Sequence, residues 1–263
     1  MNKRIITATF LMAMSSLAGF AQRQFDNLDR GLIAVKSNGG MYCSWRINAD
    51  EYYATTYDLY RDGVKVNDQP LTVSNFTDPN GTLESQYTVK AVHAGQASAD
   101  SKKGLSLANE WLEVKKPKRI SNDGKTDISN QYEPNDATIG DVDGDGEMEL
   151  ITKQLFIGQD PNNTSQADFA RIEVQKLDGT LLWWIDCGPN MWDFQQNEIN
   201  IMAYDWDGDG KAECVARLQD GSVIHMADGT TYTVGDATKD YRGGVYNFLS
   251  KGDEFLVYMN GQT

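Results

Sequence analysis

Short stretches of alternating apolar and polar residues follow one another through the first half of the chain. Apolar side chains occupy every second position in these stretches, and turn-forming residues separate them. Such alternation with frequent turns is typical of a small antiparallel β-sandwich, in which each strand buries one face. The expected strands cover 32–36, 41–46, 56–61 and 86–92.

The core of this sandwich is expected to contain Trp45, Leu59 and Tyr87. Tyr87 begins a late strand, as the tyrosine-corner residue does in sandwiches of this class. Cys43 alternates with Met41 and Trp45 on one face of a strand, which favours a small core residue. We therefore predict a fibronectin type III-like β-sandwich.

The second half of the chain repeats a strand, an Asp/Gly loop and a second strand. The loops are Asp141-Val-Asp-Gly-Asp-Gly146 and Asp205-Trp-Asp-Gly-Asp-Gly210. A hairpin with an Asp-Gly turn follows each copy, at 170–185 and at 222–234. A strand, a metal loop, a strand and a hairpin, repeated, are typical of the blades of a β-propeller.

Only part of a propeller is expected after Tyr132. About two blades are predicted, and a third unit begins at Tyr246 and includes a strand at 254–259. A propeller closes with about 4–8 blades, so we expect the chain to be an amino-terminal fragment of a longer all-β protein. The predicted organisation is a signal peptide at 1–21, a sandwich at 22–114, a linker at 115–131 and a partial propeller at 132–263.

Both Asp/Gly loops have the composition of a calcium site. Calcium takes about 6–8 oxygen ligands, which a tight loop supplies when alternate residues turn carboxylates inward and glycines permit the curvature. An EF-hand instead needs a bidentate Glu at loop position 12, where this chain has Thr152 and Ala216. The predicted ligands are Asp141, Asp143, Asp145, the carbonyl of Glu147, and Glu149 in the first loop, and Asp205, Asp207, Asp209, the carbonyl of Lys211, and Glu213 in the second.

Acidic residues outnumber basic ones, and the formal net charge is −14. Nucleic acid is therefore not an expected partner, because its phosphates require a basic surface. A basic stretch, Lys115-Lys-Pro-Lys-Arg119, precedes polar turn residues. It is interpreted as a linker or surface loop, with a polyanion-binding patch as the alternative.

The first residues have the pattern of an export signal. Lys3 and Arg4 precede an apolar run at 5–20 that ends in Gly19-Phe-Ala21. We predict a secretory signal cut before Gln22 and a secreted or periplasmic mature chain. A membrane anchor is disfavoured because the apolar run is shorter than the ~20 residues of a span, and no other segment is expected to cross a bilayer.

The three cysteines, Cys43, Cys187 and Cys214, lack metal-type spacing. An odd number of cysteines cannot form a complete disulfide framework. We predict core thiols, with a Cys187–Cys214 bridge as the alternative.

The order of these motifs along nearly the whole mature chain resembles that of the family 11 rhamnogalacturonan lyases. The resemblance implies a fibronectin-like sandwich followed by an eight-bladed propeller with several calcium ions, in agreement with the fold class predicted from the residues. The segments that carry it are 30–36, 39–40, 44–46, 60–63, 135–136, 140–146, 176–180, 184–186, 204–213 and 255–261.

The resemblance also implies a chemistry, the cleavage of the rhamnogalacturonan I backbone of pectin by β-elimination at galacturonate. A base removes the C5 proton, the adjacent carboxylate is neutralised by calcium or a cationic side chain, and the glycosidic oxygen leaves C4. By the same resemblance, Asn135, Asp136 and Lys153 are expected at the substrate. The alternative for Asn135 and Asp136 is a turn cap before the strand.

The chain departs from the family after the first loop, where members read Lys-Trp-Asp and this chain has Lys153-Gln154-Leu155. Leucine cannot accept a hydrogen bond from a sugar hydroxyl, which predicts a shifted substrate preference or reduced activity. The histidines supply no predicted base, because His93 lies in the sandwich and His225 is expected in a blade core. The cluster Trp183, Trp184 and Trp192 is expected to fill the blade core in part, with a sugar-stacking platform as the alternative.

The sequence therefore favours a secreted, calcium-dependent and monomeric rhamnogalacturonan lyase, of which these residues alone are expected to be inactive. The alternative is a non-catalytic, calcium-stabilised propeller for glycan binding or adhesion.

Overall fold

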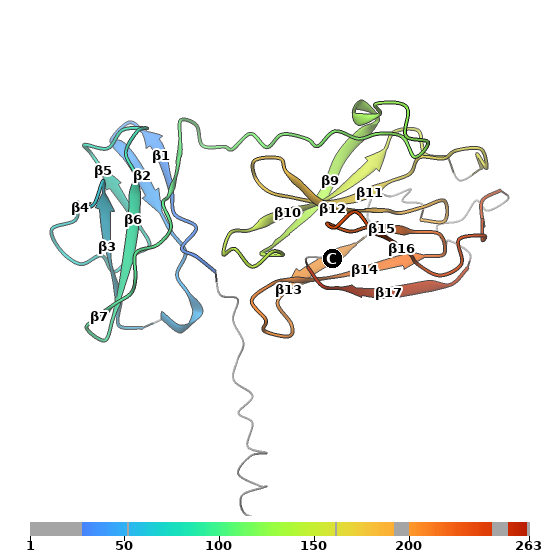
Figure 1. The fold of residues 1–263 in the computed structure, drawn as a ribbon. Coiled ribbons are helices and arrows are strands. Elements are labelled where there is room, and N and C mark those ends of the chain that lie inside the picture. The colour runs from blue at the N-terminus through green and yellow to red at the C-terminus, as the bar shows by residue number, and fades with distance from the viewer. Residues whose placement is uncertain (1–27, 52, 161, 192–199, 244–251, 262–263) are drawn as a thin grey trace, which may run out of the picture.

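The computed structural model describes residues 28–51, 53–160, 162–191, 200–243 and 252–261, which form two all-β units (Figure 1). The predicted signal peptide lies outside these residues. The first unit has two four-stranded sheets with the orders β5-β2-β1-β8 and β4-β3-β6-β7. Its elements are β1 Ile33–Ser37, β2 Gly40–Ser44, η1 Ala49–Glu51, β3 Thr55–Arg61, β4 Val64–Lys65, β5 Asn75–Asp78, β6 Tyr87–His93, β7 Gln96–Ala97 and β8 Leu105–Leu107.

The two sheets of the first unit share one core. The predicted core residues Trp45, Leu59 and Tyr87 are all buried in it, together with Met41 and Cys43. The alternation predicted the strands because each buries one face against the other sheet. The predicted core of this unit is therefore confirmed.

The second unit packs a six-stranded sheet, β16-β15-β12-β11-β10-β9, against a three-stranded sheet, β13-β14-β17. Their common core includes Ile151, Ile172 and Trp183 from the larger sheet and Cys214 and Leu218 from the smaller one. The elements are η2 Ser129–Gln131, β9 Tyr132–Gly140, β10 Glu149–Phe156, β11 Arg171–Gln175, β12 Leu181–Asp186, β13 Ile201–Tyr204, β14 Glu213–Gln219, β15 Val223–His225, β16 Thr231–Thr233 and β17 Glu254–Met259.

The second copy of the repeat does not build its sheet in the expected order. Its predicted hairpin, β15 and β16, leaves the copy and pairs with β12 of the first copy, with Ile185 opposite Ile224. The place beside β14 is taken by β17, with Ala216 opposite Val257. The strand expected to begin a third unit therefore completes the sheet of the second copy, while Tyr246 lies outside the described residues.

The basic segment before β9 does not behave as a solvated linker. It runs across the second unit in Figure 1, and Arg119 is 1% exposed. The Arg119 guanidinium donates to both carboxylate oxygens of Glu173 on β11, each at 2.6 Å. The Lys115 carbonyl also accepts a hydrogen bond from the side-chain amide of Gln175 at 3.3 Å. The expected surface loop is therefore in part a buried strap over the six-stranded sheet.

All three cysteines are buried free thiols, so the alternative Cys187–Cys214 bridge is not formed. Burial raises the pKa of Cys43 and of Cys214 to about 12. Both thiols therefore stay protonated and serve as small core side chains. Among the described residues, no helix has the length and apolar character needed to cross a membrane.

Candidate metal centre

Each Asp/Gly loop connects two antiparallel strands. The first loop joins β9 to β10, and Gly140 pairs with Glu149 across its base. The second loop joins β13 to β14, and Tyr204 pairs with Glu213 in the same way. The ninth residue of each loop is thus the first residue of a strand, which fixes its carboxylate at the mouth of the loop.

The first Asp of each loop organises the turn by accepting backbone hydrogen bonds. In the first loop, Asp141 accepts from the Gly144 and Gly146 amides at 2.9 and 2.8 Å. Both glycines have positive φ, of 76° and 86°, which L side chains rarely adopt. Glu149 closes the loop by accepting from the Val142 amide at 2.9 Å. The equivalent bonds of the second loop run from Gly208, Gly210 and Trp206 to Asp205 and Glu213.

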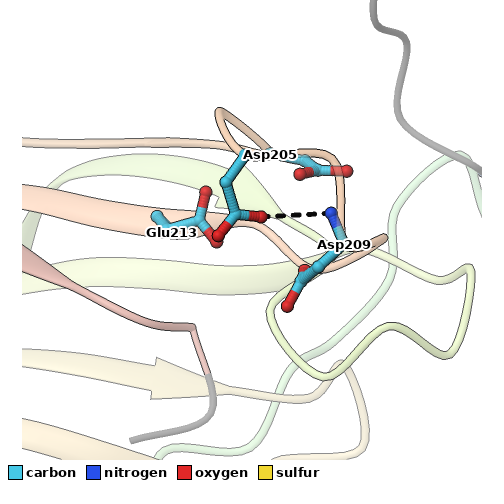
Figure 2. A group of neighbouring side chains, drawn as sticks. Asp205, Asp209 and Glu213 are labelled. Atoms are coloured by element: carbon cyan, nitrogen blue, oxygen red, sulfur yellow. Dashed lines mark hydrogen bonds between the residues drawn. The ribbon is translucent and has the colours of Figure 1, made fainter.

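The carboxylates of each loop converge, as Figure 2 shows for Asp205, Asp209 and Glu213. In the second loop, one oxygen from each of four side chains lies within 4.8 Å of the others. The four residues are Asp205, Asp207, Asp209 and Glu213. In the first loop, the corresponding group contains Asp141, Asp143 and Glu149.

The geometry of these groups suits a bound cation. Glu213 is 1% exposed, and its Oε1 atom is buried without a hydrogen-bond partner. A buried carboxylate oxygen without a donor or cation is unfavourable. An all-oxygen donor set of this kind matches the preference of calcium rather than that of zinc or copper.

Burial also changes how the first loop titrates. Desolvation raises the pKa of Glu149 to about 7, against an opposing hydrogen bond from the Val142 amide, and Asp143 adds to the rise. The pKa of Asp141 is likewise raised, chiefly by burial. Hydrogen bonding from Lys176 lowers the pKa of Asp145. A cation at the first loop would therefore favour the charged form of Glu149 and compete with its proton.

The remaining predicted ligands occupy matching turn positions in the two loops. Asp145 is turned towards Lys176, whose Nζ lies 2.9 Å from Asp145 Oδ2, and it does not join the converging group. The Glu147 amide donates to Asp145 at 2.8 Å, and the Lys211 amide donates to Asp209 at 2.9 Å. These contacts place Glu147 and Lys211 at the same point of each turn.

The three predicted substrate residues lie together at a β-bulge between β9 and β10. Ala137 pairs with Thr152 and Pro134 with Gln154, so Asn135 and Asp136 together face Lys153. Lys153 is 1% exposed, and its Nζ lies 3.7 Å from Asp136 Oδ2. Bulges of this kind re-aim side chains and recur beside active sites.

The aromatic residues divide between the core and the outer layers. Trp183 is in the core and donates its indole N–H to the Gly261 carbonyl at 2.6 Å. Trp184 stacks on His225 with ring centroids 3.7 Å apart, and His225 is not among the core residues of the second unit, where it was expected. Burial lowers its pKa, followed by the charge of Arg171. Trp192 lies outside the described residues, and His93 is exposed on the first unit.

Sequence reasoning missed two features of the second unit. One is the buried polar layer of Arg119, Arg171 and Glu173 on the outer face of the large sheet. Its signal was the alternation of charged residues along β11, which predicts a solvated face. The other is an exposed aromatic group beside the second loop, where Trp206 lies 6.1 Å from Tyr204 and 6.3 Å from Tyr258 between ring centroids.

Two protein families match the chain. The family described as "Rhamnogalacturonan I lyases beta-sheet domain" matches residues 23–106. The family described as "Rhamnogalacturonan lyase family 11, C-terminal domain" matches residues 111–263, which is more than half of the chain.

Two curated proteins of Bacillus subtilis (strain 168) are similar over most of the chain. Rhamnogalacturonan endolyase YesW is 38% identical over 276 aligned positions, which cover 100% of this chain and 43% of that protein. Rhamnogalacturonan exolyase YesX is 38% identical over 252 positions, which cover 92% of this chain and 39% of that protein. The chain thus spans about two fifths of the length of these relatives.

Solved structures agree with this similarity. The crystal structures of the lyases YesW and YesX each superpose with a TM-score of 0.72 over 92% of this chain, at 36% and 38% identity. They are matched over 41% and 39% of their own lengths. A rhamnogalacturonan lyase of Bacillus licheniformis superposes with the same TM-score at 34% identity, over 92% of this chain and 41% of that one.

Proposed function

Because the chain belongs to family 11 of the rhamnogalacturonan lyases, we propose that it forms part of a lyase that cleaves rhamnogalacturonan I by β-elimination. The observation that carries the proposal is the match of both units, in order, to lyases of this family. In this proposal the bulge binds the substrate, and the metal loops stabilise the fold that holds it.

The bulge at β9 and β10 is proposed to bind the galacturonate. β-Elimination requires that the uronate carboxylate be neutralised before the C5 proton can be removed. Lys153 brings an ammonium group to this point, held near Asp136 in a buried position. Its cation would stabilise negative charge on the uronate, while Asn135 would hydrogen-bond to a sugar hydroxyl.

Calcium is proposed to occupy both Asp/Gly loops and to brace the corners of the sheets. The converging carboxylates and the unpartnered Glu213 Oε1 support this assignment. Bound calcium would neutralise the crowded charge there. Lys153 lies on a different part of β10 from the loops, so the ions are assigned a structural role.

The finer architecture is also proposed from family membership. The first unit would be a fibronectin type III-like domain, and the second would supply the first blades of an eight-bladed propeller. The apolar run at 5–20 after Lys3 and Arg4 supports export of the protein to the periplasm or the medium. We propose that the protein acts as a monomer on pectic polysaccharide.

An assay of β-elimination tests the proposed lyase activity. The full-length protein, incubated with rhamnogalacturonan I and calcium, should generate unsaturated uronate ends that absorb ultraviolet light. Size analysis of the products would separate endo from exo attack, since relatives of both types match this chain. Residues 1–263 alone should be inactive. Absence of elimination by the full-length protein would contradict the proposal.

A non-catalytic glycan-binding protein is the second candidate. It is favoured by Gln154 and Leu155, which follow Lys153 where the family resemblance leads one to expect an aromatic and an acidic residue. Binding of rhamnogalacturonan I without any new ultraviolet absorbance would support this candidate.

A further inference from the structure

The two Asp/Gly loops lie side by side although they belong to different sheets. The Ala212 amide of the second loop donates to the Asp141 carbonyl of the first at 2.6 Å. A Cβ atom at Gly144 would lie 3.1 Å from the Gly210 carbonyl oxygen and 2.9 Å from Lys211 Cγ. The two loop backbones are therefore in direct contact.

The first loop also contacts the first unit. The Asp29 amide donates to the Gly146 carbonyl at 3.1 Å. The Lys102 ammonium donates to the Asp145 carbonyl and lies 3.8 Å from Asp145 Oδ1 and 3.7 Å from Glu147 Oε1. Asp29 accepts from the Lys102 amide at 2.9 Å, which ties these contacts together. The first loop thus contacts both units.

A second lysine holds the first loop from its own unit. Lys176, directly after β11, places its Nζ 2.6 Å from Asp143 Oδ2 and 2.9 Å from Asp145 Oδ2. Its ammonium therefore supplies positive charge between two of the carboxylates that a calcium ion would bind. Lys102 adds positive charge to the same Asp145 from the first unit.

These contacts give two nearly identical sequences different geometries. Asp209 converges with the other carboxylates of the second loop, whereas its counterpart Asp145 does not converge in the first. To complete a calcium site in the first loop, Asp145 must leave Lys176 and turn inward. The second loop needs no such rearrangement, because its four carboxylates already lie together.

We propose that Lys176 and Lys102 act as built-in counter-ions of the first loop, which make it the weaker of two calcium sites and couple its filling to the contact between the units. This inference rests on the proposed binding of calcium by both loops. Calcium at the first loop competes with the two ammonium groups, so each lysine lowers its affinity. Because Lys102 belongs to the first unit, the docking of that unit becomes part of the binding equilibrium.

Calorimetric titration of the metal-free chain with calcium chloride can separate the two sites. Asp207→Asn should abolish calcium binding at the second loop and leave the weaker site in the first loop. Asp143→Asn should abolish binding at the first loop and leave the tighter site in the second. We expect the dissociation constants of these two variants to differ by at least about tenfold.

The lysines are then tested in the background that retains only the first loop. Lys176→Met should tighten calcium binding there by about three- to tenfold, and Lys102→Met should tighten it by a smaller factor. Lys125→Met is the matched control, because Lys125 is exposed and pairs with Asp123 elsewhere. It should leave the constant unchanged. Lys176→Gln repeats the test with a polar side chain, and thermal melting of each metal-free variant verifies the fold.

Two results would overturn the inference alone: equal affinities of the two loops, or unchanged or weaker binding after loss of Lys176. Unchanged binding after loss of Lys102 would overturn the coupling to the first unit. If neither loop bound calcium, the proposed calcium sites themselves would be wrong, and the inference would end with them.

Discussion

At the scale of one side chain, Glu213 supports the proposed calcium site of the second loop. Its Oε2 atom accepts from the Trp206 amide at 2.8 Å, while Oε1 is buried without a partner. In the Glu213→Gln variant, the side chain keeps its shape and loses its charge. We expect calcium binding at the second loop to weaken by about tenfold or more, measured by calorimetry.

In the presence of a chelator, the free energy of unfolding of Glu213→Gln should not be lower than that of the wild-type protein, because the substitution removes a buried uncompensated charge. Glu133→Gln, on the exposed part of β9, serves as the control and should change neither quantity. Unaltered calcium affinity in Glu213→Gln would show that this carboxylate is not a ligand.

The raised pKa of Glu149 in the first loop predicts that the stability of the metal-free protein depends on pH. Burial raises the pKa of Glu149 from 4.5 to about 7, so the folded, metal-free protein holds a proton that the unfolded chain has released. The free energy of unfolding should therefore fall as pH rises from about 4.5 to about 7, by about 3 kcal/mol from this group.

Calcium should abolish most of this dependence, because the ion favours the charged carboxylate. Urea unfolding at about pH 5 and about pH 8, with chelator and with calcium, measures both effects. Glu149→Gln should remove the slope that Glu149 contributes. If Glu149→Gln showed the same pH dependence of the free energy of unfolding as the wild-type protein, groups other than Glu149 would be its cause.

The role proposed for Lys153 predicts that its replacement lowers the rate of catalysis. Replacing it with Met in the full-length protein keeps a similar volume and removes the cation proposed to neutralise the uronate. Loss of one positioned electrostatic group typically lowers kcat by about 100- to 1,000-fold. The rate of ultraviolet absorbance increase measures this, with circular dichroism to verify the fold. Lys125→Met is again the control, and full activity of Lys153→Met would exclude the proposed role.

At the scale of elements, the strap before β9 depends on one buried ion pair. Arg119 and Glu173 are each 1% exposed and joined by two hydrogen bonds of 2.6 Å. Arg119→Met would leave Glu173 charged and buried, which should lower the free energy of unfolding by about 3–5 kcal/mol. Urea denaturation of the second unit measures this loss.

The double variant, Arg119→Met with Glu173→Met, should recover most of that stability, because no unpaired charge remains. Lys118→Met should have almost no effect, since its side chain is 71% exposed. If Arg119→Met were as harmless as Lys118→Met, residues 115–131 would be a solvated linker after all.

The elements that sequence could predict are those fixed by near neighbours. Alternation along β3 and β6 required one buried face, and Leu59 and Tyr87 are on it. The turns of the two Asp/Gly loops were predictable for the same reason, since the converging carboxylates of each loop fall within nine consecutive residues and the glycines set the turn.

Pairings between distant segments could not be predicted. The hairpin β15–β16 had the same turn signal as the one in the first copy, yet it pairs with β12. Arg119 lies far from Glu173 in the chain, so the basic segment gave only a composition typical of a linker. The ion pairs of Lys102 and Lys176 with Asp145 could not be predicted either, because neither lysine lies within the loop sequence.

At the scale of the whole molecule, the two loops meet where both sheets of the second unit and the first unit come together. Calcium bound only by the folded state stabilises it by about 2.7 kcal/mol per site when present at about 100 times the dissociation constant. Two sites would give roughly 5 kcal/mol, or a rise of about 10–20 °C in Tm for a unit of this size. Magnesium should give a much smaller rise, because it dehydrates reluctantly and demands a stricter geometry.

This rise should be shared between the two units, because the first loop contacts both through Asp29, Lys102 and Ala212. Differential scanning calorimetry with calcium should therefore show the transitions of the two units moving closer together, whereas with chelator they should separate. A calcium-induced shift confined to the second unit would mean that the contact of the first loop with Asp29 and Lys102 does not transmit the effect of the ion.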